Sequence, residues 1–385
     1  MIRRPFPLGS ALTLDHLQID PHPYLARLRE MEPVSWVPVL DGWLVTRRDL
    51  CVDVMRDAAT FTVDDPRFST AQVVGPSMLS LDGEDHSRHR DPFASAFRLS
   101  EVRERFTKYV TNEARAIVMA LKRRGTAEIR RDLAGPLAVS VVAAALDLIG
   151  VDPGTLLAWY DEIVAAVDRV SAGGEVGVAG RTAFDSLALD VARTIANGDG
   201  VLSQATATLT TTEVVSNAAV MLFGGIETSE GMTTTLFWHL LTNPDQLQEV
   251  LADRSLVGPA IEESLRLEPA AGRVDRYATR ATELGGTEIE QGDLVIVSLS
   301  GANRDPAIFP QPDDFDLHRP NSKSHLAFAQ GPHACVGIHL ARLEARSALE
   351  AALEGWPALA LAGDPTPPTG LVFRKARSLP VRWMI

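Results

Sequence analysis

The sequence predicts a mainly α-helical protein with small peripheral β-sheets. From residue 100 to about residue 267, Ala, Leu, Val, Arg and Glu recur at three- and four-residue spacing, the pattern of packed helices. Short β-like runs precede and follow this stretch, and a Pro- and Asp-rich coil extends over 303–332, a length that is usually functional. We therefore expect a single domain over 1–385, with a β-rich part at about 30–70, a helical core at about 85–270, a β and coil region with a cysteine-containing loop at 270–337, and a final helix and β tail at 337–385.

The composition excludes several classes of protein. Hydrophobic residues make up 45% of the chain and charged residues 23%, as in globular proteins. The 37 Lys and Arg against 50 Asp and Glu give a net charge of -13, which opposes binding to nucleic acid. The most apolar stretch, 133–146, is shorter than the ~20 residues of a membrane span, and no apolar segment follows the basic pair Arg3-Arg4. We therefore expect a cytoplasmic protein without nucleic-acid or membrane binding.

The remaining elements follow from local signals. Asp41-Gly42 lies between the β-rich runs 34–39 and 43–46, a pattern typical of a hairpin. Further β-like runs lie at 276–279, 294–297 and, in the tail, 370–373. The Gly-rich run 172–180 follows no strand, which favours a loop between helices over a dinucleotide-binding loop. An amphipathic helix is expected over about 337–353.

The two cysteines, Cys51 and Cys335, exclude a disulfide framework and a CxxC metal site. Cys335 lies in an irregular loop that leads directly into the final helix. The first turn of a helix carries partial positive charge and free N–H donors, which lower the pKa of a thiol and bind a thiolate. Cys335 therefore suits a metal ligand, with a buried inert cysteine as the alternative when the thiol is considered alone.

The loop around Cys335 has a distinctive set of neighbours, namely Phe328, Gly331, His333 and Gly337. This pattern resembles the haem loop of the cytochrome P450 family, Phe-Gly-x-Gly-x-His-x-Cys-x-Gly. The resemblance implies that Cys335 is the axial ligand of iron in haem b (iron protoporphyrin IX) and that Phe328 packs beside it. A thiolate ligand pushes electron density onto iron and favours O–O cleavage. Ala329 departs from the family's usual glycine, which places the local loop geometry in question.

Gly224 and Gly225 lie inside an otherwise helical stretch over about 212–241 and are followed by Glu227 and Thr228. Two glycines cost roughly 2 kcal/mol in a helix interior, so either close helix packing or a flat ligand against the backbone must explain them. The run resembles the Ala/Gly-Gly-x-Asp/Glu-Thr segment of the distal helix in cytochromes P450. This resemblance implies that Gly224 borders the haem, that Thr228 donates a hydrogen bond to the oxygen species bound to the iron, and that Glu227 relays protons.

Glu263 and Arg266 place opposite charges at i and i+3 on a helix predicted from about Pro259. Alone, such a pair is usually a solvated surface pair. Its position about seventy residues before Cys335 resembles the ExxR helix of the P450 family, whose buried pair is held by a further Arg or His from the coil before the cysteine loop. The resemblance implies that Glu263, Arg266 and Arg319 form a structural triad.

Haem also carries two propionates, and burying a carboxylate without a partner is costly. The resemblance supplies partners from three segments. They are His86 and Arg90, which are one turn apart on a helix face, Arg276 in a β-like run, and His333 in the cysteine loop.

The substrate pocket is expected on the distal side of the haem. By resemblance, its wall contains Val220 and Phe223 of the distal helix, Gly272 at a strand entry, and Leu371 and Val372 of the tail, with the loop 73–79 covering it. These residues are mostly apolar or small, which favours an apolar or aromatic substrate of moderate size.

Taken together, the collinear motifs resemble the soluble bacterial branch of the cytochrome P450 family. We expect a haem-thiolate monooxygenase of secondary metabolism that inserts one oxygen atom from O2 into a small organic substrate, with electrons from ferredoxin and ferredoxin reductase. The same fold leaves open peroxide-driven oxidation, phenol coupling and ring formation, although Glu227 and Thr228 favour the O2 route. A non-catalytic haem binder is the weakest alternative. A basic run after His86, with Arg98 and Arg103 among its members, is expected to face the ferredoxin.

Overall fold

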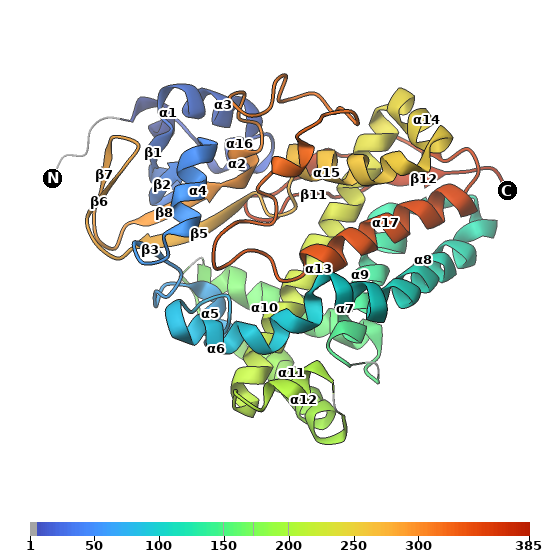
Figure 1. Ribbon diagram of the computed structural model, residues 1–385, viewed down its shortest axis with the longest axis horizontal. Coiled ribbons are helices and arrows are strands. Elements are labelled where there is room, and N and C mark those ends of the chain that lie inside the picture. Colours follow the sequence, from blue (N-terminus) through green and yellow to red (C-terminus); the bar gives the residue numbers. More distant parts are fainter. Residues whose placement is uncertain (1–5, 149, 172, 199) are drawn as a thin grey trace.

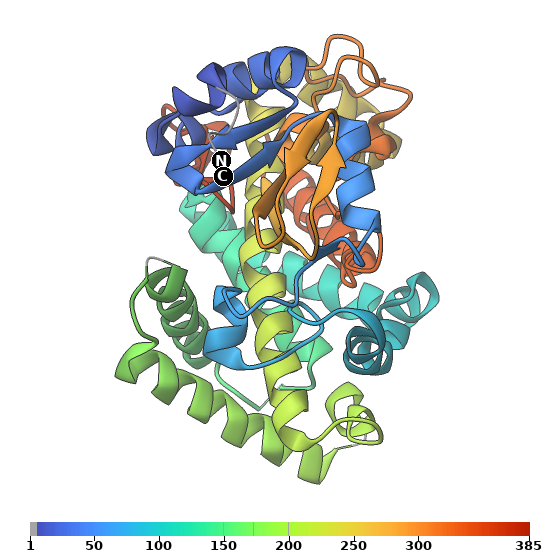
Figure 2. The same ribbon diagram turned by 90° about the vertical axis from the view of Figure 1, so that its left-hand side faces the viewer.

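The structure is a computed structural model that describes residues 6–148, 150–171, 173–198 and 200–385. A long helix, α13 (Thr211–Thr242), runs through the middle of the molecule (Figures 1 and 2). A capping box starts it, because Thr210 Oγ1 accepts from the Glu213 amide while the Glu213 carboxylate accepts from the Thr210 amide. Apolar and small residues line most of its surface, as expected for a helix that is buried in a core.

Two groups of helices pack around α13. One group encloses a large apolar cluster and consists of α8 (Thr107–Leu121), α9 (Gly135–Ala145), α15 (Val257–Leu267) and α17 (Ile338–Gly355). The other packs on the first half of α13 and includes α5 (Ser69–Val74), α10 (Pro153–Ser171), α11 (Gly177–Asn197) and α12 (Val201–Ala205). Shorter or peripheral helices are α6 (Gly83–Ala94), α7 (Leu99–Glu101) and α14 (Pro244–Ala252).

The main sheet lies beside this helical body (Figure 1) and has the strand order β1-β2-β8-β5-β3. Its strands are β1 (Val34–Val37), β2 (Gly42–Val45), β3 (Phe61–Thr62), β5 (Arg273–Ala278) and β8 (Leu294–Ser298). The hairpin predicted around Asp41-Gly42 is present, with Trp36 opposite Trp43 and Asp41 in the left-handed region at φ +47°. The helices around the sheet are α1 (Pro7–Ser10), α2 (Leu14–Gln18), α3 (His22–Met31), α4 (Arg48–Arg56) and α16 (Leu299–Ala302).

Small sheets occupy the periphery. They are formed by β4 (Thr126–Glu128), β12 (Pro380–Arg382) and β9 (Ala360–Leu361), by β6 (Thr282–Leu284) with β7 (Thr287–Ile289), and by β10 (Pro368–Thr369) with β11 (Lys375–Ala376). The predicted class, mainly α with small peripheral sheets, is confirmed. In detail, the sequence reading missed β4 and the β6–β7 hairpin, because strands of three residues carry too few side chains to show a period. The β-like run predicted at 370–373 was wrong: the chain bends at 371 and 372, between β10 and β11.

Two irregular segments differ in length from the expectation. The predicted Gly-rich loop over 172–180 is shorter, since α11 begins at Gly177; its residue 172 lies outside the described part of the chain. The predicted coil over 303–332 contains one short 3-10 turn, Ser322–Ser324. Over the described ranges, no helix is both long and apolar enough to cross a membrane.

Candidate active site

The cysteine loop is held by its own backbone and ends where α17 begins. The Cys335 amide donates to Phe328 O at 2.9 Å, and the Ala329 amide donates to Leu326 O at 2.8 Å. These bonds fold the loop into successive turns and leave the Cys335 residue exposed. Arg342 of α17 lies over the Phe328 ring, 4.6 Å from its centroid, and so fastens the loop to the following helix.

Two loop residues have left-handed backbone conformations, with different consequences. Gly331 has φ +75°, and a Cβ there would lie 2.2 Å from Met55 O, so only glycine fits. Ala329 has φ +56°, a conformation that costs an L-residue roughly 1–2 kcal/mol. The departure noted in the sequence is therefore accommodated as local strain, and the loop keeps its turn.

The two cysteines lie in different surroundings. The Cys335 residue is exposed at the face of its loop, but the protein packed around it removes part of the water from the thiol and so raises its pKa, while the Gly337 amide and the Arg90 charge act in the opposite direction. Cys51 is completely buried in α4 and donates to Val45 O at 3.3 Å, and burial raises the pKa of its thiol strongly. Cys335 is thus the exposed thiol with groups that favour a thiolate.

The two adjacent glycines of α13, Gly224 and Gly225, have different surroundings. Gly224 is exposed in the middle of the helix, and nothing in the described chain lies within 4 Å of the position a Cβ would take. At Gly225 a Cβ would lie 2.8 Å from Val142 Cγ2 of α9. Both explanations offered by the sequence therefore apply, one to each residue: Gly225 permits close helix packing, and Gly224 leaves space for a ligand. The helix itself is continuous.

The acid and alcohol that follow the glycines have defined partners. Thr228 Oγ1 donates to Gly224 O, one turn back, at 2.5 Å. One Glu227 oxygen accepts from the Tyr160 hydroxyl of α10, and the other lies 2.9 Å from Lys375 Nζ of β11. Lys375 and Tyr160 were not predicted, because each is a lone polar residue far from residue 227 in sequence.

A group of cationic and imidazole side chains lies near the cysteine loop, as the sequence predicted. The His86 and His333 rings are 4.3 Å apart, and Arg90 Nη2 donates to Ala334 O in the loop. Arg276 is 4% exposed and, within the described residues, donates only to the Asp275 carbonyl and has no ion pair. Nε2 of the buried His86 has no partner among those residues. Buried donors without acceptors fit an anionic group that the chain itself does not provide.

Asp82 is a functional-site residue that sequence reasoning missed. It occupies the N-cap position of α6, but its carboxylate does not cap that helix. It accepts instead from Thr62 Oγ1 and the Val63 amide, and lies 2.7 Å from His333 Nε2. Burial opposes ionisation, but His333 and Thr62 lower the pKa of Asp82 to about 2. Asp82 therefore orients the His333 ring, and an N-cap reading of the sequence would have hidden this role.

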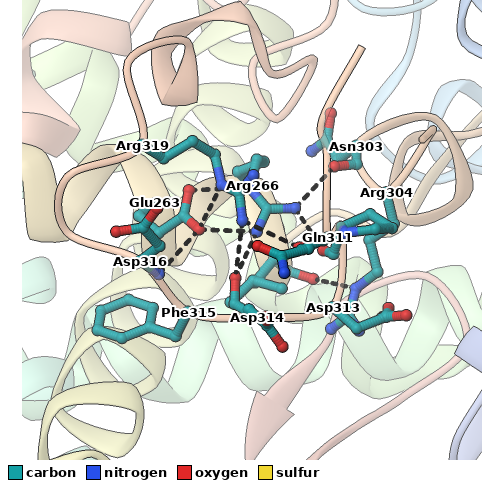
Figure 3. Close-up of polar contacts among 12 residues, drawn as sticks. Glu263, Arg266, Asn303, Arg304, Gln311, Asp313, Asp314, Phe315, Asp316 and Arg319 are labelled. Carbon is teal, nitrogen blue, oxygen red and sulfur yellow. Dashed lines mark hydrogen bonds and ion pairs between the residues drawn. The ribbon is translucent and has the colours of Figure 1, made fainter. Parts of the chain in front are cut away.

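Glu263, Arg266 and Arg319 meet in the interior (Figure 3). Arg266 donates to both oxygens of Glu263 at 2.7 and 2.8 Å, and Arg319 Nε adds a third bond at 2.9 Å. Carbonyl oxygens of the coil accept the remaining guanidinium hydrogens. The neighbouring Glu262 binds Arg342 of α17 and His325 of the coil. The helix α15 thus fixes both the coil and the start of α17, with the cysteine loop between them.

The residues expected in the pocket wall do not all lie together. Val220 is buried in the cluster beneath α10 and α11, while Phe223 is half-buried and meets Phe373 edge-on, with ring centroids 5.2 Å apart. The Gly272 amide donates to Val372 O, which ties the strand entry to the tail. Leu371 packs on the apolar cluster of the N-terminal helices and lines a small cavity together with Gly272. Phe373, two residues further along the tail, is a contact that the sequence reading missed.

Comparisons with known proteins agree with this geometry. Residues 192–368 match the family model for cytochrome P450. The monooxygenase PikC of Streptomyces venezuelae is 33% identical over 94% of this chain and 91% of its own length. The 6-deoxyerythronolide B hydroxylase of Saccharopolyspora erythraea is 31% identical, covering 96% of this chain and 98% of that protein. The crystal structure of P450BioI with a fatty-acid-ligated acyl carrier protein superposes with a TM-score of 0.86 at 26% identity, over 95% of this chain and 99% of the other.

The likeness to these two relatives and to this crystal structure extends over nearly the whole length of each protein. The chain therefore belongs to the cytochrome P450 family. It is a P450 monooxygenase, an oxidoreductase that uses haem iron.

Proposed function

We propose that the haem is haem b, that it lies between α13 and the cysteine loop, and that Cys335 is its iron ligand. The single observation that carries this proposal is the exposed Cys335 thiol at the start of α17, with Arg90 beside it. Cys51 is buried and hydrogen-bonded to Val45 O, so its thiol is not available as an iron ligand. Phe328 packs beside the ligand, and the exposed Gly224 gives the flat cofactor room along α13.

Four side chains are proposed to receive the haem propionates. Arg276 and Arg90 supply charge, and His86 and His333 supply ring donors. The support is the buried, unpaired guanidinium of Arg276 and the unpartnered Nε2 of His86 among the described residues. A carboxylate is the acceptor that such donors require.

The mechanism assigns separate tasks to the residues of this chain. When bound, the haem supplies activation of O2 with electrons from a redox partner. Thr228 holds a hydroxyl above the open face beside Gly224, and it can donate there when it gives up its bond to Gly224 O. Glu227 carries protons from the outer side of α13 toward that hydroxyl, the work of a positioned general acid. Phe223 and Phe373 exclude water from the substrate side.

We infer that the substrate is a small, apolar or aromatic organic molecule. Val220, Phe223, Gly272 and Val372 offer mostly hydrocarbon or no side chain, so few polar contacts would orient the substrate. One relative is a hydroxylase named for 6-deoxyerythronolide B, and one structural neighbour is bound to an acyl carrier protein. These likenesses support a substrate that belongs to secondary metabolism and is either free or bound to a carrier.

One spectrum tests the central assignment. The reduced, CO-bound protein should show the strongly red-shifted Soret band of thiolate ligation, and Cys335→Ser should lose it or bind haem poorly. Cys51→Ser is the control and should keep the band. An unchanged spectrum in Cys335→Ser would refute Cys335 as the ligand.

We propose a ferredoxin, with its reductase, as the electron donor. Arg98 and Arg103 are exposed, and Arg103 lies within electrostatic range of His339, at the start of α17 beside the cysteine loop. Their positive charge would attract an acidic partner to this face. Arg88, which belongs to the same basic run after His86, forms an ion pair with Glu213 at 2.7 Å.

Ionic strength provides the test for the partner. With a [2Fe–2S] ferredoxin as donor, the reduction rate should fall as salt rises, and Arg103→Glu should lower it several-fold at low salt. Arg123→Glu, at the exposed end of α8, is the control. Rates that ignore both salt and the Arg103 charge would contradict this docking face.

A further inference from the structure

The carboxylate of Glu227 is restrained on both of its oxygens by residues outside α13. Lys375 Nζ lies 2.9 Å from Oε1, and the Tyr160 hydroxyl donates to Oε2. Burial and the nearby Glu227 charge raise the pKa of Tyr160, so the phenol stays protonated and donates. In this arrangement both Glu227 oxygens are engaged, and the carboxylate is held in place by Lys375 and Tyr160.

The same Lys375 also holds a second acid. Its Nζ lies 3.0 Å from Glu230 Oε2, and the other oxygen of Glu230 lies 2.9 Å from Arg130 Nη1. Asp161 and Asp168 of α10 are in electrostatic range of Glu227, which, after burial, raises their pKa values. Lys375 therefore brings positive charge to an acidic neighbourhood, and it has a second carboxylate to bind when it leaves the first.

The tail segment that leads into β11 also carries a wall of the pocket: Phe373 forms an isolated β-bridge with Ala271 just before the strand. Phe373 is two residues before Lys375, and alternate residues of an extended chain share a face. Phe223 and Glu227, their partners, are one turn apart on one face of α13. At Gly231 a Cβ would lie 3.4 Å from both Arg374 O and Lys375 Cβ, so the tail backbone approaches α13 closely.

Arg374, between these two residues, makes the tail a stiff unit. Its guanidinium pairs with the buried Glu268 and donates to Pro368 O at 2.8 Å, Gly370 O at 2.9 Å and Gln18 O at 3.2 Å. The Arg374 amide donates to Ala270 O at 2.8 Å. The bonds to Pro368 O and Gly370 O lie within the tail and stiffen it, so a displacement of Phe373 moves Lys375 with it.

We propose that Lys375 is a positioning residue that holds Glu227 away from Thr228 while the pocket is empty, and that a substrate pressing on Phe373 withdraws Lys375 from Glu227, which leaves Lys375 on Glu230 alone and frees Glu227. This inference rests on the proposed proton relay through Glu227. The contact is part-buried, with Lys375 21% and Glu227 14% exposed, and a point-like ammonium on a flexible stem exchanges partners readily. Proton delivery, and with it the consumption of reductant, would thereby wait for substrate.

Hydrogen exchange on the haem-loaded protein tests the restraint without measuring turnover. The probe is 4-phenylimidazole, whose nitrogen binds iron while its phenyl ring fills the space above it. In the wild type, the probe should raise exchange at the amides of residues 373–376 by about fivefold, as expected when a part-buried ion pair is released. Lys375→Met should show this faster exchange without the probe, and Lys375→Arg should restore the wild-type behaviour.

Two further variants isolate the path. Arg193→Met, which breaks the exposed ion pair with Asp190 on α11, is the control and should leave exchange unchanged. Phe373→Leu should keep the slow exchange but lose most of the response to the probe. If the probe leaves wild-type exchange unchanged, or if Lys375→Met exchanges as slowly as the wild type, the restraint does not exist.

Oxygen uptake separates this inference from the proposed function. Without substrate, Lys375→Met should take up O2 about fivefold faster than the wild type when ferredoxin and reductase are supplied. Glu227→Gln should be slow in either background. A fast Glu227→Gln enzyme would overturn the relay itself, whereas a slow Glu227→Gln together with an unaltered Lys375→Met would overturn only the role of Lys375.

Discussion

Glu263 and Glu227 are both acids of the interior held by basic residues, yet their surroundings differ in kind. Glu263 is fully buried and receives planar guanidinium groups from Arg266 and Arg319, which in turn bind several carbonyls. Glu227 is partly exposed and depends on one ammonium and one phenol. Guanidinium groups that bind several acceptors at once form a rigid hydrogen-bond network, whereas an ammonium or a hydroxyl with a single contact can exchange its partner. The contacts that hold the coil before the cysteine loop are therefore rigid. The contacts of Glu227, on the proposed substrate side, are more easily rearranged.

The largest loss of stability is expected when the buried network around Glu263 is broken. Arg266→Met leaves Glu263 buried with one partner fewer, and such a loss destabilises by about 3–5 kcal/mol. Denaturant unfolding followed by circular dichroism measures the change. The matched control is Arg115→Met, whose exposed pair with Glu354 should be worth less than about 1 kcal/mol. Equal losses in the two variants would erase the contrast between a buried network and a surface pair.

On the proposed substrate side, the two glycines of α13 should respond in opposite ways. Gly225→Ala forces a Cβ against Val142 and should destabilise by about 1–3 kcal/mol. Gly224→Ala meets no described atom and should stabilise the free helix by roughly 1 kcal/mol while narrowing the space for haem. Thermal unfolding without haem and haem titration measure the two quantities. Val142→Ala should rescue Gly225→Ala; absence of rescue would mean that the close contact is not the cause.

Acid should weaken the rigid contacts through Glu262. Burial opposes its ionisation, but Arg342 and His325 lower its pKa to about 2 from an ordinary value of 4.5. A lowered folded-state pKa contributes stability above pH 4.5, and that contribution, on the order of 1 kcal/mol, is lost as pH falls from 4.5 toward 2. Urea unfolding at several pH values measures the slope. Glu262→Gln should flatten it, and an equally steep slope in that variant would assign the acid sensitivity to other groups.

The smallest effect is expected at the strained turn of the cysteine loop. Ala329→Gly relieves the left-handed alanine but adds freedom to the unfolded chain, so the net gain should be about 1 kcal/mol or less. Its partner variant, Gly331→Ala, should disrupt the loop because of Met55 O. Unfolding midpoints of both proteins test the pair. Destabilisation by Ala329→Gly would show that the alanine methyl contributes packing that outweighs its strain.

Features that depend on residues close together in the sequence could be predicted, and contacts between distant residues could not. The hairpin at Asp41-Gly42 depends on adjacent residues, and the central helix on a period repeated over many turns, so the sequence indicates both. The meeting of Arg319 with Glu263 was reachable only through the family resemblance, since 56 residues separate them. Neither a period nor a motif announces the contact of Lys375 with Glu227, because a single charged residue has no local partner to reveal its purpose.

Residues with two competing uses were the hardest to assign. Asp82 stands where an aspartate normally caps a helix, but tertiary contacts with Thr62 and His333 recruit its carboxylate. Leu371 belongs to a tail that reaches the pocket, but the chain bends at residues 371 and 372, so that Leu371 packs on the N-terminal helices and Phe373 meets Phe223. The sequence identifies the segment in each case, and three-dimensional packing decides which side chain acts.

The bond from Arg374 to Gln18 O joins residues 356 positions apart. Contacts of such separation form late in folding, because the intervening chain must first become compact. The tail's contacts with α13, from Phe373 to Phe223 and from Lys375 to Glu227, join residues that are much nearer in sequence. We therefore expect the tail to meet α13 first and the N-terminal helices to dock on the tail afterwards, so that the two ends of the chain close the fold together.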